Sequence, residues 1–272
     1  MVVQHNMQAA NTNRQLGITT NAQSKATEKL SSGYRINRAA DDAAGLSISE
    51  KMRSQIRGLD RASTNAADGI SVVQTAEGAL NEVHSMLQRM NELATQAAND
   101  TNTSVDRNAL KLELDQLSSE INRISSSTQF NTMNLLDGTF TGKNLQVGAL
   151  SGQNIQIDIV SLQATSIGVG TDDLVVTSFT SAGTTMSKVQ SAIDQVSTQR
   201  AKLGAIQNRL EHTIANLDTT SENTSSAESR IRDTDMAAMM VEYSKNNILV
   251  QAGQSMLAQA NQSTQGVLSL LQ

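Results

Sequence analysis

The sequence lacks cysteine, proline and tryptophan altogether, and aromatic residues occupy only 2% of its 272 positions. Without cysteine the chain forms no disulfide and offers no thiol chemistry. Without proline, no residue of that type interrupts a helix from within. A globular core of this size normally uses aromatic side chains as bulky filler. Their scarcity, together with abundant Ala, Leu, Ile, Gln, Asn, Ser and Thr, favours long helices packed side by side.

The signals of several partner classes are also missing. The net charge is −5, which argues against a nucleic-acid partner, because such a partner calls for a clustered basic patch. No stretch reaches about 18 consecutive apolar residues, so we expect no membrane insertion. The first residues lack the basic start and the apolar run of a secretory signal.

The sequence also lacks a recognisable catalytic or metal-binding arrangement. The histidines His5, His84 and His212 are dispersed, and none has a second His or Cys at ligand spacing. No Gly-rich phosphate loop is present, because glycines such as Gly58 and Gly69 lie inside a helical pattern. We therefore expect no enzyme, no bound metal and no cofactor.

What the sequence does contain is a long helical stretch, from about residue 45 to residue 100. Its apolar residues recur every three or four positions, which places them on one side of a helix. They are Met52, Ile56, Leu59, Ala66, Ile70, Val73, Leu80, Val83, Leu87, Met90 and Leu93. At about 1.5 Å per residue this helix is on the order of 80 Å long, so it needs partner helices of similar length.

A second helix is expected after a turn near residue 102. Thr103 and Asp106 have the spacing of a capping box. The apolar residues that follow have a 4-3-4-3 spacing, at Leu110, Leu114, Leu117, Ile121 and Ile124. The short connection makes the two helices an antiparallel hairpin. Arg89, Leu93 and Glu113 are therefore expected close together on one flank.

From about residue 130 the hydrophobic period changes from helical to alternating. Leu145 and Val147 alternate with polar residues, Ser151-Gly152 turns the chain, and Ile155, Ile157 and Ile159 alternate strictly. This pattern predicts a β-hairpin with one buried face. Residues 161–185 are rich in Gly, Ser and Thr, and residues 174–176 are a candidate short strand.

Helical spacing returns between Val189 and Leu217 and predicts a third bundle helix. Ser225 and Glu228 have capping-box spacing, which predicts the start of a final helix there. The acidic residues in the segment 233–235 could also cap backbone amides.

No charged side chain occurs between Asn246 and Gln272. A surface helix of a soluble monomer normally carries Lys and Glu on its outer face, and a membrane helix would not carry so many amides. We therefore expect this helix to be surrounded by other copies of the protein, with both chain ends ordered together on assembly. The residues expected to drive self-assembly are Ile248, Leu249, Met256, Leu257, Val267, Leu268, Leu270 and Leu271.

Several stretches of the sequence resemble bacterial flagellin. Two of them are Leu30-Ser-Ser-Gly-Tyr-Arg-Ile-Asn and Ser229-Arg-Ile-Arg-Asp-Thr-Asp-Met. The others are residues 41–46, 65–71, 75–82, 88–94, 127–131, 251–262 and 267–271. The resemblance covers roughly residues 1–140 and 186–272.

The resemblance implies a mainly α fold, in which the N- and C-terminal segments form a long antiparallel helical bundle or coiled coil with a small β-hairpin region mid-chain. It implies a terminal filament-core domain from residues 1–45 and 228–272. A helical bundle domain is expected at residues 46–227, with a hairpin at about 138–180 and no large variable outer domain. The implied function is that of a structural subunit that polymerises into the flagellar filament for motility.

The resemblance also implies a set of partners and a location. The protein is expected to be secreted into the extracellular flagellum and to contact other copies of itself. Further partners are an export chaperone at the C-terminal segment, filament cap and hook-associated proteins, and Toll-like receptor 5. The receptor-contacting residues of the family fall on Arg89, Leu93 and Glu113. Two alternatives are a hook–filament junction protein, and a binding protein for adhesion or immune signalling.

Overall fold

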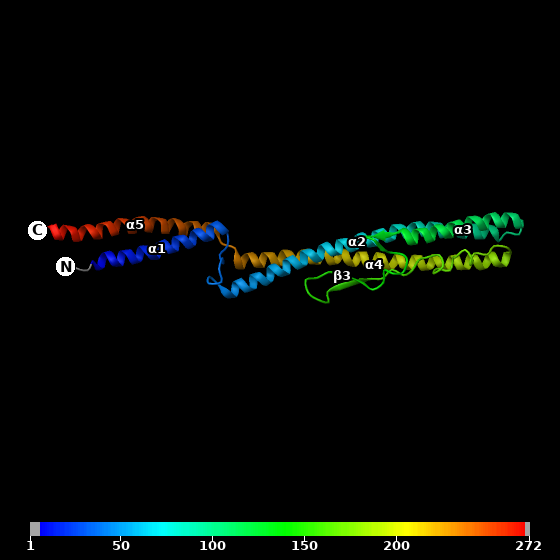
Figure 1. Cartoon of the computed structure of the whole chain (residues 1–272), viewed down its shortest axis with the longest axis horizontal. Coiled ribbons are helices and arrows are strands. Elements are labelled where there is room, and N and C mark those ends of the chain that lie inside the picture. Colours follow the sequence, from blue (N-terminus) through cyan, green and yellow to red (C-terminus); the bar gives the residue numbers. More distant parts are fainter. Residues whose placement is uncertain (1–5, 270–272) are drawn as a thin grey trace. The chain divides into compact units, whose positions relative to one another are not determined.

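The computed structural model describes the backbone of residues 6–269 and the side chains of residues 6–263. The helices are α1 (Met7–Ser32), α2 (Ala43–Ala97), α3 (Ser104–Ser127), α4 (Phe179–Arg232) and α5 (Met236–Ser269) (Figure 1). The strands are β1 (Gln129–Phe130), β2 (Met133–Asn134), β3 (Lys143–Gln146) and β4 (Asn154–Ile157), paired as two antiparallel hairpins. The predicted mainly α fold with a small hairpin region is confirmed.

The chain divides into two compact units. The terminal unit contains Met1–Ser54 and Asn223–Gln272, and the central unit contains Gln55–Glu222. The terminal unit therefore holds α1, α5, the first turns of α2 and the last turns of α4. The central unit holds the rest of α2 and α4 together with α3 and all four strands.

Local hydrogen bonds explain where the helices of the hairpin begin. Asp42 starts α2 by accepting the backbone N–H of Gly45 at 2.8 Å. At α3 the Thr103 hydroxyl accepts the N–H of Asp106, and the Asp106 carboxylate accepts the N–H of Thr103 at 2.9 Å. The capping box predicted from the sequence is thus present.

The core of the central unit is shared by α2, α3 and α4. The predicted stripe of α2 supplies Val73, Leu80, Val83, Leu87, Met90 and Leu93, all 1% exposed or less. These residues form one cluster with Leu114 and Ile121 of α3 and with Val189, Val196 and Leu203 of α4. Each fully buried side chain of this kind stabilises the fold by about 1.5–3 kcal/mol.

The hairpin of β3 and β4 lies against α2 of the same unit. Leu145 pairs with Ile155, and Ile155 and Ile157 are buried while the residues between and before them are exposed. This alternation was predicted. Gly58 provides the room that the hairpin needs, because a Cβ there would lie 2.8 Å from the Cβ of Ala149. A Cβ at Gly69 would collide with the Leu145 side chain.

The hairpin region is narrower than the predicted range of 138–180, and the candidate strand at 174–176 is wrong. Residues 158–178 form no strand, yet they bury Ile159, Leu162, Ala164, Ile167, Val169, Leu174 and Val176. Side chains of the helices satisfy the carbonyls of this segment. Ser118 donates to Val169 O at 2.8 Å, Thr185 to Val175 O at 2.8 Å, and Gln199 to Asp158 O at 3.0 Å. These bonds replace a strand ladder.

The predicted helix start at Ser225 and Glu228 is also wrong, because α4 continues without a break to Arg232. No glycine or proline lies near this point to stop the helix. Glu228 instead accepts a hydrogen bond from the Ser49 hydroxyl at 2.8 Å. The final helix begins at Met236. The Asp235 carboxylate caps it by accepting the backbone N–H groups of Ala237 at 2.9 Å and Ala238 at 3.1 Å.

Candidate functional site

In the terminal unit, α1 and α5 pack against each other as an antiparallel pair (Figure 1). Most of the buried and half-buried residues follow a regular three-four spacing on both helices, as in a coiled coil. On α1 they are Ala9, Thr12, Leu16, Thr19, Gln23, Ala26 and Leu30. On α5 they are Met239, Tyr243, Asn246, Val250, Gly253, Leu257 and Ala260. We refer to these fourteen residues as the seam.

Eight of the fourteen seam residues are small or polar. Gly253 meets Leu16 closely, since a Cβ on Gly253 would lie 3.1 Å from Leu16 Cδ1. Asn246 is only 7% exposed, and its side-chain amide nitrogen finds no hydrogen-bond partner within the described residues. Because a buried, unsatisfied amide is destabilising, and small residues bury little apolar area, the seam stabilises the pair less than a seam of large apolar residues would.

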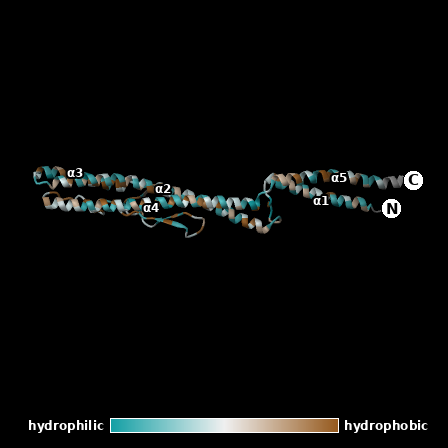
Figure 2. Ribbon diagram, turned by 180° about the vertical axis from the view of Figure 1, so that it is seen from behind, coloured by the Kyte–Doolittle hydropathy of each residue, from teal (hydrophilic) through white to brown (hydrophobic). Residues whose placement is uncertain are grey.

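Larger apolar side chains of α5 lie outside the seam. Met236, Met240, Val241, Ile248, Leu249 and Met256 are all between 46% and 70% exposed. Hydrophobic residues are mixed with hydrophilic ones along the coloured part of α5 (Figure 2). Exposed apolar side chains gathered on one helix mark an interaction surface. We call these six residues the outer face of α5.

The predicted self-assembly residues fall into three groups. Ile248, Leu249 and Met256 belong to the outer face, and Leu257 belongs to the seam. Val267 and Leu268 lie within α5 but have side chains outside the described set, and Leu270 and Leu271 lie outside the described residues altogether.

A clip between the two chain ends was not predicted. α1 ends at Gly33, which has a φ of 75°, and Tyr34 then forms an antiparallel bridge with Asp233. The guanidinium of Arg232 lies 4.8 Å from the centre of the Tyr34 ring and donates to Glu50 at 3.3 Å. This clip, made of Tyr34 and Arg232, holds the end of α1 beside the end of α4 and so fixes where the chain leaves each of these helices.

The receptor-site candidates separate into exposed and buried residues. Arg89 Nε lies 3.0 Å from Glu113 Oε1, and Arg89 Nη1 lies 3.1 Å from Glu92 Oε2. Hydrogen bonds that Arg89 donates to Glu113, first, and to Glu92 raise the pKa of Arg89. Leu93 is 1% exposed and belongs to the core cluster. The structure therefore places Arg89 and Glu113 together at the surface and Leu93 inside the bundle.

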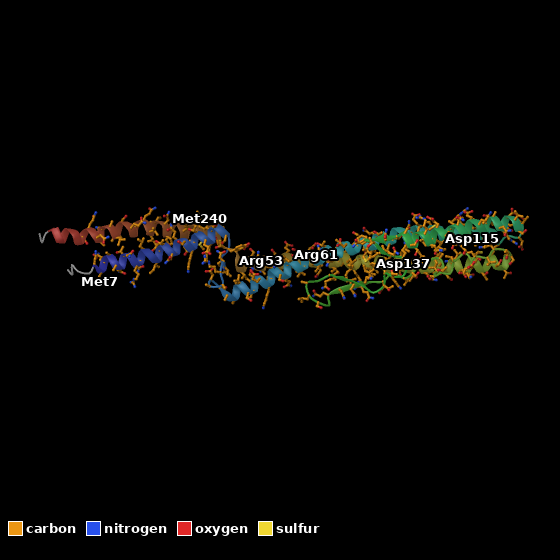
Figure 3. The ribbon with its side chains drawn as sticks, in the orientation of Figure 1. Met7, Arg53, Arg61, Asp115, Asp137 and Met240 are labelled. Atoms are coloured by element: carbon orange, nitrogen blue, oxygen red, sulfur yellow. The ribbon has the colours of Figure 1, made fainter. Side chains whose placement is uncertain are left out.

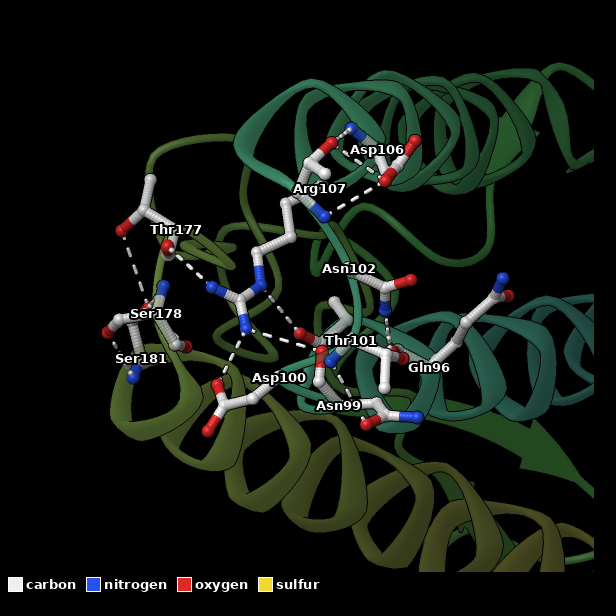
Figure 4. A network of polar contacts seen from close by, with 12 residues as sticks. Gln96, Asn99, Asp100, Thr101, Asn102, Asp106, Arg107, Thr177, Ser178 and Ser181 are labelled. Atoms are coloured by element: carbon white, nitrogen blue, oxygen red, sulfur yellow. Dashed lines mark hydrogen bonds and ion pairs between the residues drawn. The ribbon is translucent and has the colours of Figure 1, made fainter.

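Another unpredicted group surrounds Arg107 at the turn between α2 and α3 (Figure 4). Its guanidinium donates to Ala97 O at 3.0 Å, to the Asp100 carboxylate at 3.0 Å and to Thr177 O at 3.4 Å. Arg107 thus ties this turn to the residues just before α4. Thr177 lies 70 residues away in the sequence, so no local pattern predicts this contact.

No other kind of site emerges from residues 6–269. Nowhere in this range do three or more His, Asp or Glu side chains gather as a metal site would require. No helix in the same range has both the length and the apolar character needed to cross a membrane.

Two family models match most of the chain. The model of the bacterial flagellin N-terminal helical region matches residues 3–141, and that of the bacterial flagellin C-terminal helical region matches residues 186–271. The chain belongs to the flagellin family. The stretch between the two matches holds β3, β4 and the strand-free residues 158–178.

Individual flagellins agree with this assignment. A flagellin of Halalkalibacterium halodurans is 56% identical over 271 residues, covering all of both chains. The flagellar filament 31.3 kDa core protein of Treponema maltophilum is 48% identical over 286 residues, again covering all of both chains. The crystal structure of Bacillus cereus flagellin matches with a TM-score of 0.51 and 31% identity, covering 61% of this chain and 94% of that one.

Proposed function

We propose that the protein is a structural subunit that polymerises into the extracellular bacterial flagellar filament and serves motility. The observation that carries this proposal is the outer face of α5, where six apolar side chains are exposed on a helix without charges from Asn246 onward. A full-length relative from Treponema maltophilum is named as a filament core protein. The proposed role is structural and not enzymatic.

The energetics of this proposal follow from the exposed side chains. Removing one such side chain from water contributes about 1.5–3 kcal/mol. Several of them on each subunit can therefore offset the loss of freedom on association, which costs roughly 4–15 kcal/mol. Contacts that repeat from head to tail without closing generate a filament instead of a ring.

The composition of the seam suggests a further step. An α1–α5 pair whose seam is more than half small or polar residues gains further order when copies cover the outer face of α5. We therefore propose that the two chain ends become fully ordered on assembly, as in coupled folding and binding.

Seeded polymerisation tests the proposal. Ile248→Gln with Leu249→Gln adds no charge to α5 and stays helix-compatible, but it removes two exposed apolar side chains. We expect this variant to extend filament fragments at least about tenfold more slowly, because one lost apolar contact already costs more than 1.4 kcal/mol. Electron microscopy and sedimentation measure the product.

Gln254→Ala, an exposed change on the same helix, is the matched control and should elongate normally. Elongation of the double variant at the rate of the unchanged protein would contradict the assembly role of α5. The same assay separates the hook–filament junction alternative, because only a filament subunit extends seeds indefinitely.

The remaining partners are proposed from the family resemblance. An export chaperone would cover the uncharged C-terminal segment inside the cell, where its apolar residues would otherwise associate too early. Filament cap and hook-associated proteins would contact the polymer at its two ends.

We also propose recognition of the free subunit by Toll-like receptor 5. The exposed pair of Arg89 and Glu113 supports this, with Leu93 supporting the helix from the core. We expect Arg89→Ala and Glu113→Ala each to weaken receptor binding roughly tenfold, as truncation of a charged hot-spot residue does. Arg123→Ala removes a comparable exposed pair with Glu120 on α3 and should leave binding unchanged. Equal binding by all three variants would exclude this surface.

A further inference from the structure

Methionine is concentrated in the terminal unit. The chain has eleven methionines, and seven of them belong to this smaller unit. Those seven are Met1, Met7, Met52, Met236, Met239, Met240 and Met256. The larger central unit holds only Met86, Met90, Met133 and Met186.

Three of the four methionines of α5 are also accessible. Met236, Met240 and Met256 are 48%, 51% and 53% exposed. The first two lie one helical turn apart at the start of α5, where Figure 3 labels Met240. In the central unit Met90 is completely buried. The side chains that form half of the outer face of α5 are thus thioethers open to solvent.

A solvent-exposed thioether is a substrate for peroxides. The sulfur attacks one peroxide oxygen, the O–O bond breaks, and a sulfoxide S–O bond forms while the other oxygen leaves as water. The sulfur loses two electrons and hydrogen peroxide gains them. The product is a polar, chiral side chain in place of a flexible apolar one, and methionine sulfoxide reductases can reverse the change.

We propose that Met236, Met240 and Met256 form a peroxide-sensitive modification site, and that their oxidation stops the subunit from polymerising. This inference rests on the proposed filament function. A sulfoxide oxygen has to be stripped of water when the outer face of α5 is covered, and burial of a polar group without a partner is unfavourable. Contact with another copy would also shield the unmodified sulfur atoms, so the free subunit reacts and the assembled one is protected.

The first measurement maps the oxidation without any assembly. The full-length free subunit is treated with dilute hydrogen peroxide, and peptide mass spectrometry follows the gain of one oxygen at each methionine. We expect Met236, Met240 and Met256 to react at least about tenfold faster than Met90, since oxidation follows exposure. Met133, which is 42% exposed in the central unit, should react at a rate similar to theirs. Equal rates at Met240 and Met90 would overturn the proposal.

The second measurement is seeded polymerisation of treated and untreated subunits. We expect oxidation to slow elongation about tenfold, and reductase treatment to restore it. A variant with Met236→Leu, Met240→Leu and Met256→Leu keeps apolar volume and should elongate equally before and after peroxide. Met133→Leu is the matched control and should remain peroxide-sensitive.

The outcomes separate the two proposals. Untreated subunits that fail to extend seeds would contradict the filament function itself. Treated and untreated wild-type subunits that extend seeds alike would overturn only the oxidation site. The same holds if the triple leucine variant loses elongation after peroxide to the same extent as the wild type.

Discussion

Single residues set the response of the fold to acid. The Asp137 carboxylate accepts the hydroxyl of Thr139 at 2.6 Å and its backbone N–H at 2.9 Å. These bonds, the hydroxyl first, hold the pKa of Asp137 below its ordinary value of 3.8. A group whose pKa is lowered by folding adds stability that is complete above the unfolded pKa. That stability is lost as the pH falls through the folded pKa.

We therefore expect the free energy of unfolding to decline as the pH drops below about 4. Asp137→Asn should flatten part of this decline, because the amide does not titrate. Urea denaturation at a series of pH values between about 2 and 6 gives the two slopes. Identical slopes for both proteins would show that Asp137 has the same pKa in the folded and unfolded chain.

Which residues could be foreseen depends on how far apart their partners lie in the sequence. Thr103 and Asp106 were predictable, because a capping box is a four-residue pattern with its own geometry. Leu93 is buried as its place in the apolar stripe of α2 indicates. The clip between Tyr34 and Arg232 could not be derived, since its two halves stand near opposite ends of the chain.

At the scale of elements, two glycines of α2 give opposite predictions. An alanine normally stabilises a helix by about 0.5–1 kcal/mol relative to glycine. Gly78 has no atom within 4 Å of the position of an added Cβ, so Gly78→Ala should be stabilising by that amount. At Gly58 the new methyl would meet both Cβ and Cα of Ala149, at 2.8 and 3.2 Å.

Gly58→Ala should therefore destabilise the protein by about 1–3 kcal/mol, because the hairpin backbone must move away from α2. Chemical denaturation of both variants checks the difference in sign. Stabilisation by Gly58→Ala equal to that by Gly78→Ala would mean that the hairpin does not press on α2.

Elements with a hydrophobic periodicity of their own were predictable. Segments whose conformation depends on hydrogen bonds from neighbouring helices were not. The alternation of Ile155 and Ile157 is intrinsic to a strand with one buried face. Residues 158–178 also alternate in places, but Ser118, Thr185 and Gln199 on neighbouring helices satisfy their carbonyls. The capping-box pattern at 225–228 failed for the converse reason, since a cap starts a helix only where the preceding chain is not already helical.

At the scale of the whole molecule, the two units should differ in stability. In the free subunit we expect amide protons of α1 and α5 to exchange at least about a hundredfold faster than those of α2 between Leu80 and Leu93. Most seam residues are only half-buried, whereas that stretch of α2 lies in a large core. Hydrogen-exchange mass spectrometry measures both. Equal protection in the two regions would contradict ordering on assembly.

The absence of charge on α5 after Lys245 has a consequence for where such a polymer can operate. Dissolved ions weaken attractions between charges over distances of about 8–10 Å at ordinary ionic strengths. A contact made from hydrocarbon, thioether and amide groups presents nothing for those ions to screen. Association of subunits through this helix should consequently be as strong at low ionic strength as at high ionic strength.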